Sequence, residues 1–213
     1  MKNIIILGAG DFAKEVIWLI EDINANEPSY NIVGCLDDDE AKLGNVYKDV
    51  ECLGTLDLLL QLAAEQNACA VIAMQNTVTR KAIVARFPDF TAWETLVHPT
   101  ANIPDTSTIG RGSILCTGST VSVNSVIGEH CLFNINATIG HDCCLADYVS
   151  VMSGACVSGH VVVGEGAYLG TNCTVLPGKR VGSSATVGAG SVVIRNVRAE
   201  TSVMGVPAKR IKL

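Results

Sequence analysis

The sequence predicts a protein of two parts, a small α/β domain followed by a parallel β-solenoid of triangular coils. In the second part, an aliphatic or aromatic residue occupies every sixth position from Ile103 to Val193, and a small residue mostly follows four positions later. A period of six fits neither a helix, with about 3.6 residues per turn, nor a hairpin sheet, but it is typical of a solenoid that repeats a strand and a turn. The first part instead alternates apolar runs of strand length with segments of helical spacing.

The composition agrees with this organisation. A chain of 213 residues with 48% hydrophobic residues can bury one large or two modest cores, and an aromatic content of 5% suits the narrow interior of a solenoid. A formal net charge of −6 argues against nucleic-acid binding, and no apolar run has the length of a membrane span. Residues 1–7 enter a strand and show no signal-peptide cleavage pattern, so we expect a cytoplasmic protein without membrane insertion.

The first domain opens with a candidate nucleotide-binding turn. Residues 3–7 are expected to form a buried parallel strand, Gly8-Ala9-Gly10-Asp11-Phe12-Ala13 a turn, and Lys14 to about Asn24 a helix. In this context glycines let the backbone approach a phosphate, and the N-terminus of the helix favours the anion. Ala13 stands in place of a third glycine, so a tight turn without a ligand is the alternative.

A cluster of acids ends the second expected strand, Asn31 to Leu36. Asp37, Asp38 and Asp39 would lie near the glycine-rich turn and could accept hydrogen bonds from a ribose or a base edge; a solvated loop is the alternative. The remaining expected elements complete only half of a dinucleotide fold, which leaves no room for a second nucleotide and excludes a nicotinamide-dependent dehydrogenase. They are a helix at Leu56–Gln66, a strand at Ala68–Met74, a helix at Thr79–Phe87 and a strand near Thr91–Val97.

Pro99 marks the boundary between the two domains, because proline disfavours helix in the residue before it. The predicted domains are therefore residues 1–97, a Rossmann-like domain, and residues 98–213, the solenoid with a short C-terminal tail. Within the solenoid the repeat runs to about Asn196, and the tail from Gly205 to Ile211 leaves it.

Nine cysteines show neither CxxC pairs nor a Cys/His metal spacing. Cys131, Cys143 and Cys173 take the small-residue position of the repeat, so we expect reduced, structural thiols and no metal. The adjacent pair Cys143-Cys144 is the one place where reactivity deserves a check.

One of the four histidines stands out as a candidate base. His98 is expected to be structural, and His130 and His160 are expected in exposed turns. His141 lies in the turn of a middle coil with Asp142 beside it. A neutral imidazole can take a proton from an amine or a hydroxyl, and a carboxylate in contact would fix its tautomer.

The hexapeptides, the His141-Asp142 turn and the closing Gly205-Val206-Pro207-Ala208-Lys209 resemble the left-handed parallel β-helix acyltransferases. The opening turn, the aspartates at 37–39 and the Leu96-Val97-His98-Pro99-Thr100-Ala101 junction are similar to those of the sialic-acid O-acetyltransferase (NeuD-type) family, which includes PglD-like nucleotide-amino-sugar N-acetyltransferases. The resemblance covers essentially the whole chain.

This resemblance implies a homotrimer with active sites between neighbouring subunits. Acetyl-CoA would lie between two solenoids, the nucleotide sugar would bind the small domain, and His141 would take the proton from the sugar amine with Asp142 strengthening the base. By the same match the substrate-binding residues are Gly10, Asp11, Phe12, Asp37, Asp38 and Gln75. The acetyl-CoA contacts, made mostly through the backbone, would fall at Ser150, Gly159, Thr171 and Ala189.

Two departures bear on the acceptor, because Phe12 and Ser150 stand where PglD-like enzymes can carry histidine. The expected function is acetyl transfer to the amine of a nucleotide-linked sugar of the 4-amino-4,6-dideoxy type, in surface glycan biosynthesis. An O-acetyltransferase acting on sialic acid or another glycan hydroxyl is one alternative, and a non-catalytic solenoid that binds a nucleotide sugar is another.

Overall fold

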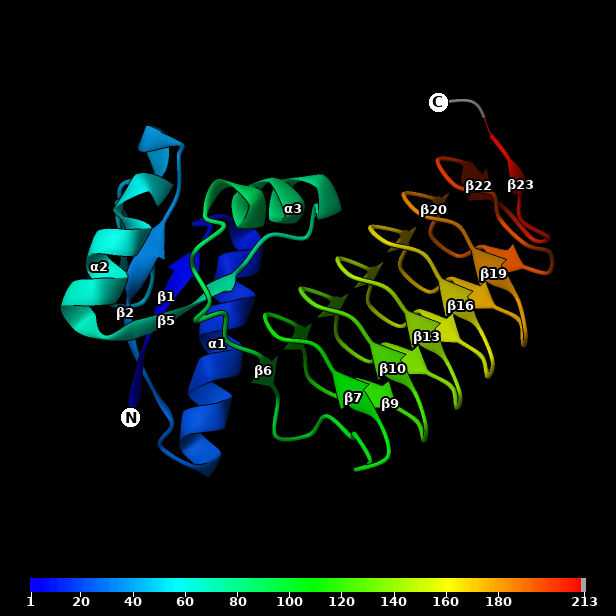
Figure 1. Ribbon diagram of the computed structural model, residues 1–213, viewed down its shortest axis with the longest axis horizontal. Coiled ribbons are helices and arrows are strands. Elements are labelled where there is room, and N and C mark those ends of the chain that lie inside the picture. The colour runs from blue at the N-terminus through cyan, green and yellow to red at the C-terminus, as the bar shows by residue number, and fades with distance from the viewer. Residues whose placement is uncertain (212–213) are drawn as a thin grey trace. The chain divides into compact units, whose positions relative to one another are not determined.

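The computed structural model describes residues 1–211, so Lys212 and Leu213 of the expected tail lie outside the described residues. The chain divides into two compact units, Met1–Pro99 and a second unit that begins at Thr100. Figure 1 colours the first unit from blue to green and the second from green to red. Among residues 1–211, no helix combines the length and the apolar character that a membrane span requires.

The first unit is a five-stranded sheet with the order β3-β4-β2-β1-β5. All its pairings are parallel except that of β3 with β4. Residues 4–7 of β1 are fully buried at its centre, as the apolar run predicts. The strands are β1 (Lys2–Leu7), β2 (Tyr30–Leu36), β3 (Gly44–Tyr47), β4 (Val50–Gly54) and β5 (Ala68–Ile72). The helices are α1 (Asp11–Asn26), the short 3₁₀ turns η1 (Glu40–Lys42) and η2 (Leu56–Leu58), α2 (Leu59–Gln66) and α3 (Thr77–Arg86).

Two features of this unit differ from the sequence prediction. The hairpin β3–β4 was not expected, because its strands are short and β4 shows little of the apolar run that marks β1 and β5. The strand expected near Thr91–Val97 is reduced to a bridge between Trp93 and Ala70 and to the two-residue β6 (Leu96–Val97). Two backbone hydrogen bonds of Ala70, to Ala92 and from Glu94, form this bridge, and the buried Trp93 packs edge-to-face on Phe90.

The second unit is a solenoid whose strands from β7 to β21 stack into parallel sheets, each strand pairing with the one 18 residues further on, as Thr138 does with Cys156. The last parallel pairing, of β20 with β22, joins Thr186 to Ser202. One sheet has the order β19-β16-β13-β10-β7 and another β21-β18-β15-β12-β9, while the third includes β22-β20-β17-β14-β11-β8. Three strands and three turns therefore make one triangular coil, which confirms the solenoid. Its strands are β7 (Thr108–Ile109), β8 (Ile114–Leu115), β9 (Thr120–Val121), β10 (Val126–Ile127), β11 (Leu132–Phe133), β12 (Thr138–Ile139), β13 (Cys144–Leu145), β14 (Ser150–Val151), β15 (Cys156–Val157), β16 (Val162–Val163), β17 (Tyr168–Leu169), β18 (Thr174–Val175), β19 (Arg180–Val181), β20 (Thr186–Val187), β21 (Val192–Val193), β22 (Ser202–Met204) and the closing β23 (Lys209–Arg210).

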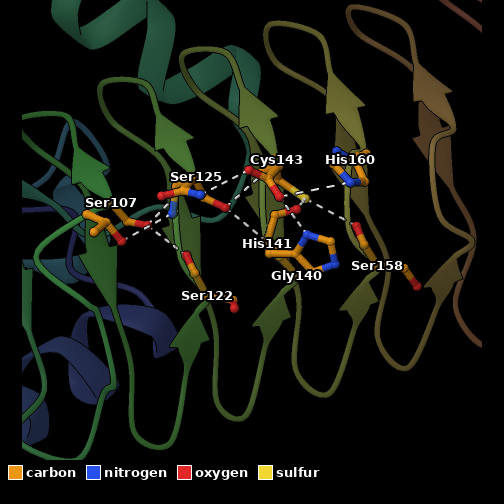
Figure 2. Close-up of polar contacts among 11 residues, drawn as sticks. Ser107, Ser122, Ser125, Gly140, His141, Cys143, Ser158 and His160 are labelled. Carbon is orange, nitrogen blue, oxygen red and sulfur yellow. Dashed lines mark hydrogen bonds and ion pairs between the residues drawn. The ribbon is translucent and has the colours of Figure 1, made fainter.

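The apolar residue of each repeat fills the interior. From Leu115 to Val193 every residue of the sixfold series is at most 3% exposed, and Phe133 is the largest of them. The small residues beside them are also buried, and some join neighbouring coils through hydrogen bonds (Figure 2). Ser125 Oγ accepts from the Cys143 backbone N–H at 3.1 Å and donates to the Gly140 carbonyl at 2.9 Å, so the turn that carries His141 is tied to a buried polar ladder.

The thiols are free, and seven of the nine are buried. Burial raises the pKa of Cys35, Cys69 and Cys173 to about 12, which keeps these groups protonated and unreactive. Of the adjacent pair, Cys143 is buried and donates from its thiol to the Ser158 carbonyl, whereas Cys144 is exposed.

Candidate active site

The candidate base lies at one corner of the solenoid, in the turn between β12 and β13 (Figure 2). His141 Nδ1 is 2.7 Å from Asp142 Oδ2, and the two side chains are 52% and 38% exposed. The residues that were adjacent in the sequence are therefore in contact, and the imidazole remains accessible to a substrate.

Asp142 is held so that one carboxylate oxygen faces the imidazole. Its backbone adopts a left-handed conformation, with φ of 55°, and its Oδ1 accepts from Asn124 Nδ2 at 3.2 Å. The hydrogen bonds from His141 and Asn124 lower the pKa of Asp142. Because an ionised carboxylate only accepts hydrogen bonds, an imidazole in its neutral form would bond it through Nδ1–H and carry its lone pair on Nε2.

A glycine makes room for this nitrogen. Gly159 lies one coil further on from His141, and a β-carbon at residue 159 would come within 2.5 Å of His141 Nε2. The absence of a side chain there lets the ring lie directly against the backbone of the next coil. The structure thus brings together three of the predicted site residues, His141, Asp142 and Gly159.

His160, which was expected only in an exposed turn, also lies at this corner. Its Nε2 is 3.9 Å from Asp142 Oδ2, and its ring meets the His141 ring edge-on with centroids 4.9 Å apart. It is exposed, as expected. Its position follows from the period, because His160 comes 18 residues after Asp142, which is the length of one coil.

The expectation for His130 was wrong. This side chain is only 1% exposed, and its ring stacks on Tyr148 with centroids 5.5 Å apart. Gly112 on the preceding coil leaves the space that the ring occupies. His98 is buried, as a structural residue would be, and its Nε2 is 3.0 Å from Asp22 Oδ2.

The residues predicted to bind the nucleotide sugar gather at the carboxyl ends of β1, β2 and β5 in the first unit. Gly10, Asp11, Phe12, Asp37 and Gln75 line a pocket of about 310 Å³. A second pocket of about 330 Å³ shares some of its lining and is bordered by Asp37, Asp38, Leu56, Ile83 and Arg86. The first pocket has polar groups from the glycine-rich turn and suits a sugar phosphate. The second pocket has mostly apolar walls and suits a base.

Asp37 organises this end of the sheet. Its side chain is buried, and it accepts hydrogen bonds from the backbone N–H of Ala9 at 2.8 Å and of Asp39 at 3.0 Å. Lys42 Nζ lies 2.9 Å from Oδ2. Burial opposes the ionisation of Asp37, but these donors outweigh it and lower the pKa of the carboxyl below its usual value.

Replacing Asp37 with Asn should destabilise the first unit by about 1–3 kcal/mol at pH 7, since the donors of Ala9, Asp39 and Lys42 lose a charged, buried acceptor. Because the folded pKa is lowered, the contribution of Asp37 is present above its unfolded value, about 3.9, and is lost as the pH falls through the folded value. Urea unfolding at pH 7 and pH 3 measures this. If the free energies of unfolding of wild type and Asp37→Asn differed equally at pH 7 and pH 3, this prediction would be contradicted.

The side chains that border Asp38 form an ion-pair network at the rim of the second pocket. Asp38 Oδ1 accepts from the Leu56 N–H at 3.0 Å, and Oδ2 accepts from Arg86 at 2.6 Å. Arg86 also binds Asp57 at 2.5 Å. Asp38 therefore holds Arg86 at the mouth of the pocket.

The residues predicted to contact acetyl-CoA do not all lie at the His141 corner. Thr171 and Ala189 are exposed and stack on successive coils at a different corner, in the turns that follow β17 and β20. Ser150 is 0% exposed, on β14 between Leu132 and Tyr168. Only Gly159 accompanies the candidate base, and the acetyl-CoA contacts of all four residues stay a prediction.

Residues 3–87 match the family described as the PglD N-terminal domain. The acetyltransferase domain of PglB from Neisseria gonorrhoeae FA1090 is 30% identical to this chain, with a TM-score of 0.89 and coverage of 99% of this chain and 100% of that domain. The chain belongs to the NeuD/PglD-like sugar acetyltransferase family.

Two further solved structures are similar to this chain over nearly its whole length. PerB from Caulobacter crescentus, solved in complex with CoA and GDP-perosamine, is 28% identical, with a TM-score of 0.89 and coverage of 100% of this chain and 98% of PerB. WeeI from Acinetobacter baumannii AYE is 28% identical, with a TM-score of 0.87 and coverage of 99% and 100%. None of the curated proteins that were compared matches the chain.

Membership of the NeuD/PglD-like family confirms the predicted fold, a small Rossmann-like α/β domain followed by a left-handed parallel β-helix. It also makes the chain an acyltransferase, which rules against the non-catalytic solenoid.

Proposed function

We propose that this protein is an acetyl-CoA-dependent N-acetyltransferase that modifies the amine of a nucleotide-linked sugar of the 4-amino-4,6-dideoxy type, for surface glycan biosynthesis. One observation carries the proposal. An accessible imidazole, with Nδ1 on Asp142 and Nε2 over Gly159, stands in a chain that is similar from end to end to an enzyme solved with CoA and GDP-perosamine.

The proposed reaction needs little chemistry from the protein. The sugar amine attacks the thioester carbon, the C–S bond breaks, and the nitrogen loses one proton. His141 Nε2 accepts that proton while Asp142 stabilises the imidazolium through Nδ1–H. The proton can then pass to the departing thiolate of CoA, which leaves the imidazole neutral for the next turnover.

Positioning would supply most of the acceleration, because a thioester is already activated. Holding two reactants in the correct geometry contributes roughly 7–11 kcal/mol. The two pockets of the first unit would hold the nucleotide sugar, with Asp37 and Lys42 at the first and Arg86 at the second. A backbone N–H near Gly159 would bond the thioester carbonyl.

The proposal includes a homotrimer in the cytoplasm. Thr171 and Ala189 lie at a different corner of the solenoid from His141. One acetyl-CoA molecule could contact Thr171 and Ala189 of one subunit and His141 of a neighbouring subunit in such an assembly. Light scattering of the purified protein measures the mass of the assembly. A monomer of 22.4 kDa at the concentrations used for activity would contradict the trimer.

Product analysis tests the function. Purified protein is incubated with acetyl-CoA and with GDP-, UDP- and dTDP-linked 4-amino sugars, and in parallel with free and CMP-linked sialic acid. We expect acetylation of an amine, with free CoA released in equal amount. Transfer only to a sialic-acid hydroxyl would favour an O-acetyltransferase, which the same base would serve.

Replacing Asp142 with Asn should lower kcat by only about fivefold, because an exposed ion pair is screened by water. The Asn amide can still accept from Nδ1–H through its oxygen, but it carries no charge to stabilise the imidazolium. Steady-state kinetics measure the effect. A loss as large as that caused by removing His141 would contradict this small contribution and would mean that the base depends on Asp142 for its tautomer or its charge.

A further inference from the structure

Three potential metal ligands lie together at the His141 corner. His141, Asp142 and His160 each offer one donor atom, and these atoms all lie within 4.8 Å of one another. Asp142 Oδ2 is the central atom, 2.7 Å from His141 Nδ1 and 3.9 Å from His160 Nε2. Two imidazoles and a carboxylate are therefore grouped on successive coils, where the sequence showed no metal spacing.

The carboxylate is oriented by a group outside this set. Asn124, Asp142 and His160 occupy the same left-handed turn position on three successive coils, with φ of 57°, 55° and 58°. The Asn124 amide donates to Asp142 Oδ1, which leaves Oδ2 directed at the two imidazoles. A hydrogen bond that fixes the free oxygen of a ligand is a common feature of protein metal sites.

The chemistry of the three groups selects the kind of ion. Two imidazoles and one carboxylate suit divalent transition metals, of which Zn²⁺ is typical, and three protein ligands leave further positions open. Ligands at about 2.0–2.2 Å from Zn²⁺ lie roughly 3–3.6 Å apart in a tetrahedral site. In the structure the donor of His141 is closer to Asp142 than this, and the donors of the three residues lie up to 4.8 Å apart, so the exposed side chains of His141 and His160 must rotate when the ion binds.

We propose that His141, Asp142 and His160 bind Zn²⁺ and that the bound ion inhibits the enzyme. To coordinate through Nδ1, His141 must adopt the tautomer with its proton on Nε2. The nitrogen over Gly159 then donates a hydrogen bond and has no lone pair to accept a proton from an amine. The ion is an inhibitor in this scheme and takes no part in turnover. Binding stands on the geometry alone, whereas inhibition rests on the proposed function.

Cobalt titration tests binding without turnover. Co²⁺ is added to the full-length protein, freed of metal by chelator and dialysis, and visible absorption is recorded with Zn²⁺ as competitor. We expect d–d bands for wild type and at least about a 10-fold weaker affinity for His160→Asn. Asn keeps the left-handed turn, so this variant should fold. Equal affinity in wild type and His160→Asn would overturn the proposal.

Two controls sharpen the result. Cys144 is the nearest exposed thiol in the sequence, so Cys144→Ser should bind Co²⁺ as wild type does, and loss of binding in it would assign the ion to sulfur. Mg²⁺, which prefers oxygen ligands, should not displace Co²⁺.

Inhibition is measured separately, as acetyl transfer by wild type and by His160→Asn with and without Zn²⁺. We expect wild type to be inhibited, reversibly by chelator, and whatever activity His160→Asn has to resist the same Zn²⁺ concentration. Binding of Co²⁺ without inhibition of an active enzyme would overturn the inhibitory role. Absence of transfer to any acceptor would instead count against the proposed function and leave the cobalt result intact.

Discussion

Replacing His141 with Asn is expected to lower kcat about 10²–10⁴-fold, the range that a general base contributes. Asn retains an amide that can bond Asp142 but cannot accept a proton at neutral pH. The side chain is half exposed and does not belong to the buried core, so the melting temperature should stay close to that of wild type. Steady-state kinetics with saturating acetyl-CoA measure the loss.

His160→Asn is the matched control, because it removes the other imidazole from the same corner of the solenoid. It should lose clearly less activity than His141→Asn in metal-free buffer. CoA affinity, measured by calorimetry, should survive in both variants. Near-normal turnover by His141→Asn would remove the proposed base and leave only the architecture.

Replacing Gly159 with Ala should lower kcat by about 10²-fold, since a displacement of roughly 1 Å at a catalytic group can cost this much. The added methyl group would approach within 2.5 Å of His141 Nε2, so the exposed ring must swing away from the next coil. The φ angle of Gly159 lies outside the left-handed range, so alanine is compatible with the backbone and the fold should be kept. The Gly159→Ala variant therefore keeps the imidazole but changes its position, whereas His141→Asn removes the imidazole.

The neighbouring substitution Ser158→Ala serves as the control, because it removes an atom and adds none beside the ring. Its backbone carbonyl, which accepts from Cys143, is unchanged. A Gly159→Ala enzyme with wild-type kcat would show that the ring can act from another position, and the contact with Gly159 would then have no part in catalysis.

The sequence by itself determined the solenoid and the place of the candidate base. A period of six predicts the coil because the inside of each coil must be apolar, and it sets the 18-residue distance between stacked positions. The same pattern indicated His141 beside Asp142, and the glycine-rich turn with Asp37 indicated the pocket at the end of the sheet. These features are local, so neighbouring residues carry enough information to find them.

Only the tertiary structure decided which turn side chains are exposed to solvent and which contact one another. His130 and His160 occupy similar turns, and the period stacks each of them on a residue 18 positions away, yet His130 is buried against Tyr148 while His160 stays exposed beside Asp142. The hairpin β3–β4 likewise depends on the pairing of β4 with β2, and the segment before β6 depends on the bridge between Trp93 and Ala70. The physical reason is the same in each case, since burial and donor distances depend on residues one coil or one strand away, which a local pattern does not contain.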